Sequence, residues 1–230
     1  MDIDAKTAQK QAAAEFAVGL VEFDRIVGIG SGSTVAEFIK RLAPLAANIP
    51  GVVVASSASE RIALEAGLRV WSLNDALASN VAPKFYFDGA DEIEPGFAMI
   101  KGGGAALTRE KIVASACETF VCLVDESKLV SALGKFALPV EVVPMAEAFV
   151  MRKLQRLGGS PKKREAPLTD NGNIIIDVSG LFPINPGALE GEVNQIPGVL
   201  SNGIFARRRA DQLIIAGANV RHEHAPVSTW

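Results

Sequence analysis

Short apolar runs alternate with helix-like segments along the N-terminal part of the chain, and this alternation constrains the fold more than any other feature. The apolar runs have the length and side chains of buried strands and span residues 26–29, 52–56, 69–72, 85–88 and 119–124. Helical patterns lie before and between them, at residues 7–20, 33–45, 60–66 and 109–116. Strands that alternate with helices form mostly parallel sheets covered on both faces. We therefore expect an α/β fold with a Rossmann-like sheet.

The pattern of the chain changes after Gly134. The segments that follow predict a strand, a helix, a hairpin around Asp170-Asn171-Gly172, a second helix and a last strand, at residues 138–143, 145–157, 163–168 with 173–178, 186–196 and 199–205. This β-α-β-β-α-β order is that of a ferredoxin-like domain. A further apolar run, 212–216, is expected to return to the first sheet. We predict an α/β catalytic domain, residues 1–133 and 209–230, with an inserted smaller α+β domain, residues 134–208.

Acidic and glycine residues gather directly after the strand predicted at 85–88. Asp88 and Asp91 fall at its carboxyl end, where open α/β sheets bind ligands. Lys101 then precedes three glycines, residues 102–104, whose backbone can approach an oxyanion closely. A strand-ending aspartate often only caps a turn. The combination of acids, a cation and consecutive glycines nevertheless favours a site for a charged ligand.

The helix predicted at 109–116 adds another acid to this stretch. Thr108 could cap that helix, which would set Glu110 in its first turn. An acid at this position commonly just complements the helix dipole. Glu110 is nevertheless a candidate site residue, because it follows Lys101 by nine residues in the same polar stretch.

A second glycine-rich segment, Gly28-Ile-Gly-Ser-Gly-Ser-Thr34, joins a predicted strand to a predicted helix. Such a turn directs backbone N–H groups at an anion on the helix N-terminus. A dinucleotide fingerprint would place its third glycine at Ser33 and would require an acid after the next strand, which residues 52–57 lack. A P-loop would require a lysine before its Ser or Thr. A small phosphate site remains, with a turn that is glycine-rich only for packing as the alternative.

These motifs, together with Asp88-Gly-Ala-Asp-Glu-Ile93, Lys101-Gly-Gly-Gly-Ala-Ala-Leu-Thr-Arg-Glu-Lys-Ile112 and Gly134-Lys-Phe-Ala-Leu-Pro-Val-Glu-Val-Val-Pro144, resemble the type A ribose-5-phosphate isomerases. The resemblance runs from about residue 8 to about residue 217. Ser31 stands where many members have threonine, and the tail after Ala218 has no match.

The resemblance implies that D-ribose 5-phosphate and D-ribulose 5-phosphate interconvert through an enediol or enediolate, in the non-oxidative pentose phosphate pathway and without a metal or other cofactor. It implies Glu110 as the general base and Lys101 as a donor to the developing oxyanion. Asp88 would serve proton exchange at the sugar oxygens or ring opening, and Asp91 would hold hydroxyls. It also implies a homodimer or homotetramer.

The substrate contacts implied by the resemblance lie in five places along the chain. Lys128 is among them, although it could equally be a surface lysine. The implied contacts are Lys10, Ser31, Gly32, Ser33, Thr34, Asp88, Gly89, Ala90, Asp91, Lys101, Gly102, Gly103, Gly104 and Lys128.

Charge and composition exclude several other classes of protein. The net charge of −3 and the short run Arg207-Arg208-Arg209 give no nucleic-acid footprint. No apolar stretch reaches the roughly 20 residues that span a bilayer, so we expect a cytoplasmic enzyme. Cys117 and Cys122 lie in apolar surroundings that favour buried reduced thiols. The two histidines, His222 and His224, have too few ligands nearby for a metal site.

Two other functions remain open at this point. A non-catalytic sugar-phosphate sensor would need the pocket but not the base. An acyl or coenzyme A transferase would form a covalent intermediate on a glutamate. The presence of Glu110 together with Lys101 and both aspartates favours the isomerase.

Overall fold

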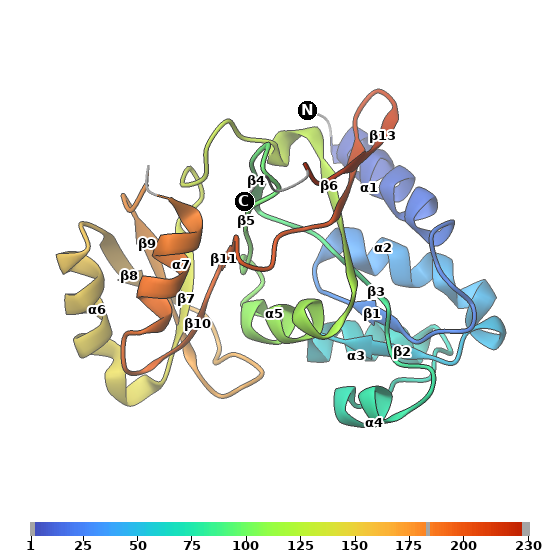
Figure 1. Ribbon diagram of the computed structural model, residues 1–230, viewed down its shortest axis with the longest axis horizontal. Coiled ribbons are helices and arrows are strands. Elements are labelled where there is room, and N and C mark those ends of the chain that lie inside the picture. The colour runs from blue at the N-terminus through green and yellow to red at the C-terminus, as the bar shows by residue number, and fades with distance from the viewer. Residues whose placement is uncertain (1–2, 183–184, 227–230) are drawn as a thin grey trace. The chain divides into compact units, whose positions relative to one another are not determined.

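The structure is a computed structural model that describes residues 3–182 and 185–226 (Figure 1). The chain divides into two compact units. The first unit comprises Met1–Gly89, Ile112–Lys128 and Ala210–Trp230, and the second comprises Ala90–Lys111 and Leu129–Arg209. These units assign residues 90–111, 129–133 and 209 differently from the expected domains, whose boundaries stay a prediction.

A six-stranded sheet forms the centre of the first unit. Its strands lie in the order β13-β12-β6-β3-β1-β2, and every neighbouring pair is parallel except β12 with β13. The strands are β1 (Val27–Ile29), β2 (Val52–Val54), β3 (Phe85–Asp88), β6 (Thr119–Asp125), β12 (Gln212–Ala216) and β13 (Val220–His224). The predicted parallel sheet is confirmed, and so is the return of residues 212–216 to it.

Helices cover this sheet because its strands carry apolar side chains on both faces. The helices of the first unit are α1 (Ile3–Val18), α2 (Ser33–Leu42), α3 (Ser57–Glu65) and α4 (Leu73–Ala78), with 3₁₀ turns η1 (Ala43–Asn48) and η2 (Glu126–Lys128). Phe38 of α2 packs on Phe87 of β3, with ring centroids 4.6 Å apart. On the opposite face, Gly28 leaves room for the Cys117 sulfur and the Tyr86 ring. Cys117 follows α5 (Leu107–Ala116).

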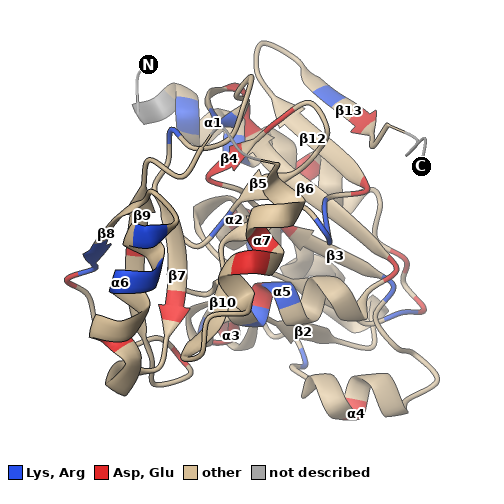
Figure 2. Cartoon of the chain, turned by 60° about the vertical axis from the view of Figure 1, so that its left-hand side comes forward, with Lys and Arg blue, Asp and Glu red and all other residues tan. Residues whose placement is uncertain are grey.

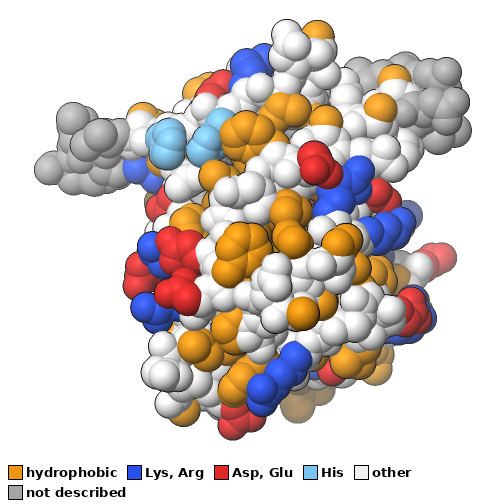
Figure 3. All heavy atoms as spheres, turned by 90° about the vertical axis from the view of Figure 1, so that its right-hand side faces the viewer, with side chains coloured by type: hydrophobic (Ala, Val, Ile, Leu, Met, Phe, Trp, Pro, Cys, Tyr) orange, Lys and Arg blue, Asp and Glu red, His pale blue; other side chains and the backbone are white. Residues whose placement is uncertain are grey.

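The strand predicted at 69–72 is wrong. Only Val70 bridges Val52, because Ser72 is already the N-cap of α4, its side chain accepting a hydrogen bond from the Asp75 N–H. Helix α4 and strand β13 were not predicted from the sequence. In β13, His222 and His224 lie on the same edge strand with ring centroids 4.9 Å apart. Figure 3 shows the histidines at the surface beside apolar side chains.

The second unit contains the predicted β-α-β-β-α-β order. Its four-stranded sheet, in the order β10-β7-β9-β8, is antiparallel throughout. The elements are β7 (Leu138–Val142), η3 (Pro144–Ala146), α6 (Glu147–Arg156), β8 (Ser160–Lys163), β9 (Ile174–Ser179), α7 (Pro186–Asn194) and β10 (Val199–Asn202). A three-stranded sheet, β11-β5-β4, completes the unit with β4 (Glu92–Ile93), β5 (Met99–Ile100) and β11 (Ile204–Phe205).

Two predicted strands of the second unit differ from the structure. The strand expected at 163–168 lies earlier, at β8. The Arg164 N–H still donates to Ile175 O at 2.9 Å, but the chain then turns, with the Ala166 N–H donating to Arg164 O at 3.1 Å. The strand expected at 199–205 divides at Gly203. The N–H of Gly203 donates to Pro139 O at 2.8 Å and its carbonyl accepts from the Lys101 N–H at 2.9 Å, so the chain passes from one sheet to the next at this residue.

Candidate active site

Asp88 is fully buried at the end of β3 and is held on both carboxylate oxygens. Its Oδ1 accepts the N–H groups of Ser31 at 3.0 Å and Gly89 at 2.7 Å, and its Oδ2 accepts the Tyr86 hydroxyl at 2.5 Å. A Cβ on Gly30 would lie 1.9 Å from the Asp88 Cγ. The glycine at position 30 is therefore required for close packing on Asp88. The hydrogen bond from Tyr86 was not predicted from the sequence.

The start of α2 has the form expected of an anion site. Gly32 precedes the helix with a φ of 89°, which favours glycine, and no side chain caps the helix. Gly32 and Ser33 are exposed, while Ser31 and Thr34 are half-buried. The first N–H groups of a helix have no partner within it, and they can bind an anion. The Ser31 N–H, in contrast, is already bound to Asp88.

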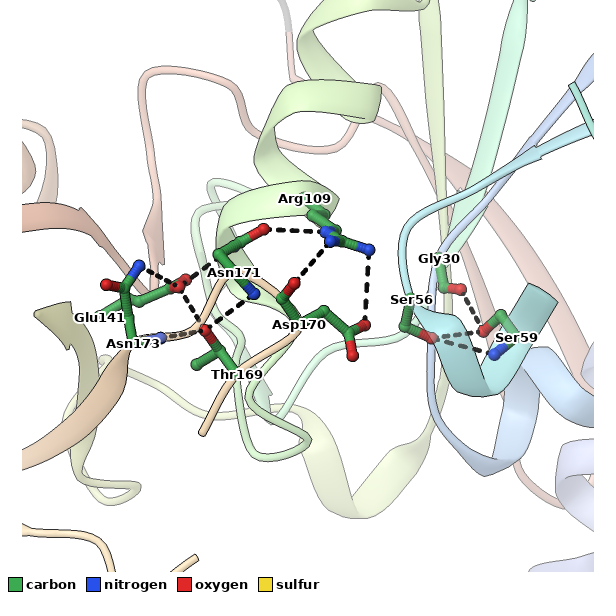
Figure 4. A network of polar contacts seen from close by, with 9 residues as sticks. All are labelled: Gly30, Ser56, Ser59, Arg109, Glu141, Thr169, Asp170, Asn171 and Asn173. Atoms are coloured by element: carbon green, nitrogen blue, oxygen red, sulfur yellow. Dashed lines mark hydrogen bonds and ion pairs between the residues drawn. The ribbon is translucent and has the colours of Figure 1, made fainter. Parts of the chain in front are cut away.

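The loop before α2 is tied to α3 through its backbone. Ser59 Oγ donates to the Gly30 carbonyl at 2.7 Å, and Ser56 Oγ donates to Ser59 Oγ at 3.0 Å (Figure 4). Ser56 also caps α3 by accepting the Ser59 N–H. These bonds fix the backbone immediately before the anion-binding turn.

Lys101 and Glu110 form a buried ion pair in the second unit. The Lys101 Nζ lies 3.2 Å from the Glu110 Oε2, and the two side chains are only 3% and 4% exposed. Lys101 directly follows β5, and Glu110 lies in the first turn of α5 as expected. A buried charge is stable only when it is paired. The fold thus brings together two residues that the sequence predicted as site residues.

Thr108 does not cap α5, contrary to the sequence analysis. The helix begins at Leu107, and the Glu110 N–H donates to Ala106 O, so Thr108 already lies inside the first turn. Its hydroxyl instead donates to a carboxylate oxygen of Glu141 on β7. The predicted cap was wrong because the buried Glu141 carboxylate binds the Thr108 hydroxyl. This partner is 33 residues away in sequence, so no local pattern indicates it.

Glu141 is the centre of a polar network that the sequence analysis missed. This fully buried carboxylate lies within β7, where Figure 2 shows an acidic residue on an otherwise uncharged strand. Besides the bond from Thr108, it accepts hydrogen bonds from Thr169 Oγ1 at 2.6 Å, Asn173 Nδ2 at 3.0 Å and Asn171 Nδ2 at 3.1 Å (Figure 4). An acid inside an apolar strand pattern was the signal that could have revealed it.

Arg109 adds a second link between α5 and the same turn. Its Nε donates to Asn171 Oδ1 at 2.9 Å, and its Nη2 donates to Asp170 O at 2.7 Å (Figure 4). The first turn of α5 is therefore held to the 169–173 turn through Arg109, the residue directly before Glu110.

The glycine loop, residues 102–105, lies between Lys101 and α5. The Gly103 N–H donates to Asp91 Oδ2 at 2.8 Å, and the Ala105 N–H donates to Gly102 O at 3.0 Å. Gly102 has a φ of 109° and Ala105 a φ of 60°. The loop is thus a tight turn with one non-glycine residue in a left-handed conformation. Asp91, Lys101 and Glu110 all belong to the second unit, whereas Asp88 and residues 31–34 belong to the first.

Several expectations concern residues outside these contacts. Among the described residues, neither Lys10 on α1 nor Lys128 at the end of η2 has a recorded hydrogen bond or ion pair, and both are half-buried. Cys117 and Cys122 are buried and form no disulfide, as predicted. Within residues 3–182 and 185–226, no group of three or more His, Cys, Asp or Glu side chains could hold a metal ion. No helix in this part of the chain could cross a membrane.

Comparisons with known proteins point to one family. The family model of ribose 5-phosphate isomerase A (phosphoriboisomerase A) matches residues 51–220. Ribose-5-phosphate isomerase A of Histophilus somni strain 2336 is 52% identical over 209 residues, covering 90% of this chain and 94% of that protein. The corresponding protein of Pasteurella multocida strain Pm70 is 52% identical over 207 residues, covering 90% and 93%.

Solved structures agree over nearly the whole chain. The crystal structure of ribose 5-phosphate isomerase A from Neisseria gonorrhoeae matches with a TM-score of 0.91 and 44% identity, covering 96% of this chain and 98% of that one. The enzyme from Methanocaldococcus jannaschii matches with a TM-score of 0.87 and 37% identity, covering 94% and 98%. This protein is a member of the ribose 5-phosphate isomerase A family.

Proposed function

We propose that this protein interconverts D-ribose 5-phosphate and D-ribulose 5-phosphate, with Glu110 as the general base. Membership of the family supports the aldose–ketose isomerase activity, which belongs to the non-oxidative pentose phosphate pathway. The assignment of Glu110 rests on one observation, its buried pairing with Lys101 at 3.2 Å. A carboxylate in this setting is shielded from water yet retains a counter-charge beside it.

The reaction moves one proton between two neighbouring carbons. Glu110 removes the proton from C2 of the open-chain aldose, and the electrons of that bond form the C1–C2 double bond while negative charge develops on O1. O1 takes up a proton to give the enediol. Loss of the O2 proton then forms the C2 ketone as Glu110 returns its proton to C1. One carboxylate can therefore serve both half-reactions.

The charge on the substrate oxygen requires donors that are in place before it forms. We assign this role to the Lys101 ammonium group and to the backbone N–H group of Gly104, since the Gly103 N–H is already bound to Asp91. Asp91 holds the loop through the Gly103 N–H and keeps a second carboxylate oxygen for sugar hydroxyls. Asp88, next to Gly89 and Ala90, is assigned to proton exchange at the sugar oxygens or to ring opening.

The phosphate is assigned to the N-terminus of α2. Gly32 and Ser33 are exposed there, and the helix dipole adds partial positive charge. Lys10 and Lys128 are retained as additional substrate contacts on the strength of the family resemblance alone. A cytoplasmic homodimer or homotetramer also stays a prediction, which light scattering on the purified protein would test.

The sensor alternative is not favoured, because the relatives over nearly the whole chain are named as isomerases. A sensor would also have no use for a buried Glu–Lys pair.

The test is conversion of ribose 5-phosphate in metal-free buffer with direct detection of the ketose, for the wild type and Glu110→Gln. The variant should lose activity by roughly 10² or more, the scale of a lost general base, and should still bind substrate. Glu147→Gln is the matched control, since Glu147 is an acid in the first turn of α6 and should be dispensable. Full activity of Glu110→Gln would show that another residue is the base.

A further inference from the structure

We propose that Arg164 is a positioning residue for the isomerisation, acting through the carbonyl groups of the glycine loop. This inference rests on the proposed role of that loop at the substrate oxyanion. Arg164 is 62 residues from Gly102 in sequence and belongs to the other part of the second unit, just beyond β8. Nothing in its sequence context points to the active site.

The guanidinium group of Arg164 bridges a carboxylate and the loop. Its Nη1 donates to the carbonyls of Gly102 at 2.9 Å and Gly103 at 3.1 Å. Its Nε and Nη2 donate to the two oxygens of Asp177 on β9, at 2.8 Å and 2.5 Å. Two parallel bonds to one carboxylate fix the plane of a guanidinium. Asp177 therefore sets the direction in which Arg164 presents its remaining donor.

The peptide between Gly102 and Gly103 is held at both ends. Its carbonyl accepts from Arg164, and its N–H donates to Asp91 Oδ2 at 2.8 Å. Ala105 closes the turn at a φ of 60°, a sparsely populated conformation that persists only when the surroundings fix it. A cation on one side and a carboxylate on the other supply that constraint.

Arg164 also affects the donors that this loop offers. A cation bound to a peptide carbonyl polarises the peptide and makes its N–H a stronger donor. The Gly103 carbonyl bound by Arg164 belongs to the same peptide as the Gly104 N–H. Gly104 is exposed and lies on the loop that we assign to the oxyanion. Arg164 thereby orients and strengthens a donor that matters when charge develops, without touching the substrate.

A merely structural arginine would affect stability and leave the chemical step intact. A positioning role predicts a different split between kinetic constants, because oxyanion donors stabilise the transition state more than the bound substrate. We expect Arg164→Ala to lower kcat by about 10- to 100-fold, less than the roughly 10²–10³ for removal of a direct donor. KM and inhibition by inorganic phosphate should change less than about threefold.

The experiment compares the wild type with Arg164→Ala, Arg164→Lys and Lys163→Ala. Lysine keeps the charge but cannot bind Asp177 with two parallel bonds, so Arg164→Lys should lie between the wild type and the alanine variant. Added guanidinium at millimolar concentration should raise kcat of Arg164→Ala and leave the wild type unchanged. Lys163 is the matched control, because this neighbouring cation only pairs with Glu147 at the surface.

Three results would overturn the inference. These are an unchanged kcat in both Arg164 variants, a rise in KM with kcat intact, and a loss of activity that merely follows the unfolded fraction seen in thermal melts. Glu110→Gln is assayed in parallel to separate the two proposals. If Glu110→Gln is inactive while the Arg164 variants are fully active, only the role of Arg164 fails, whereas an active Glu110→Gln refutes the proposed base itself.

Discussion

Removal of one partner from the buried Lys101–Glu110 pair should cost far more stability than removal of a closer pair at the surface. In Lys101→Met the Glu110 carboxylate stays in a site that is only 4% exposed but loses its cation. Breaking a buried pair in this way costs about 3–5 kcal/mol. Since about 1.4 kcal/mol is tenfold, the unfolding equilibrium constant should rise by roughly two to nearly four powers of ten.

The surface pair of Lys163 with Glu147 provides the comparison. Its atoms are closer, 2.7 Å against 3.2 Å, but its side chains are 48% and 35% exposed. Exposed pairs contribute about 0.2–1 kcal/mol, because water screens the charges. Lys163→Met should therefore change the free energy of unfolding by less than about 1 kcal/mol. Burial, and not distance, decides the ranking.

The assay is urea denaturation of the wild type, both lysine variants, Glu110→Gln and the double variant Lys101→Met/Glu110→Gln. The double variant leaves no uncompensated buried charge, so it should regain most of the stability that Lys101→Met loses. Activity should stay low in every variant that lacks Lys101 or Glu110. The reasoning is refuted if Lys101→Met is as stable as Lys163→Met, or if the double variant loses the sum of the two single losses.

Three further changes test other parts of the structure. In Gly30→Ala the new Cβ would displace the Asp88 carboxylate. The free energy of unfolding should therefore fall by at least about 3 kcal/mol, the value of two hydrogen bonds to a charged group, and turnover should be abolished. Thr108→Val should cost about 1.5–3 kcal/mol in urea denaturation, since it removes one hydrogen bond to the buried Glu141. Burial lowers the pKa of His222 below 6.5, so on acidification the unfolded chain takes up this proton before the folded protein does. The free energy of unfolding of the wild type should therefore fall as the pH drops below about 6.5, and His222→Gln should lack this part of the pH dependence.

Controls for these changes come from the same chain. Gly96→Ala should be tolerated, because its nearest contact would be 3.6 Å away. Thr119→Val should lie within about 0.5 kcal/mol of the wild type, since the recorded hydrogen bond of Thr119 uses its backbone N–H. For the histidine, a constant difference in stability between wild type and variant from pH 7 to pH 5 would contradict the expected titration.

The elements that the sequence determined are those whose side-chain pattern is local. Strands β3 and β12 lie where the sequence predicted them, because each is an apolar run bounded by polar residues. The acids, the lysine and the glycines of the active site were also visible as residue types. The strand predicted at 69–72 was wrong because a strand requires a partner along its length, and the sequence does not show that Ser72 caps a helix.

Only the tertiary structure decided which groups bind one another. Asp88 meets the Ser31 N–H across 57 residues, Thr108 meets Glu141 across 33, and Arg164 meets Gly102 across 62. A local pattern fixes the face on which a side chain lies, since it reflects the repeat of the helix or strand. The choice among distant donors and acceptors depends on how the sheets and loops pack, because each buried polar group must find a partner within hydrogen-bond distance.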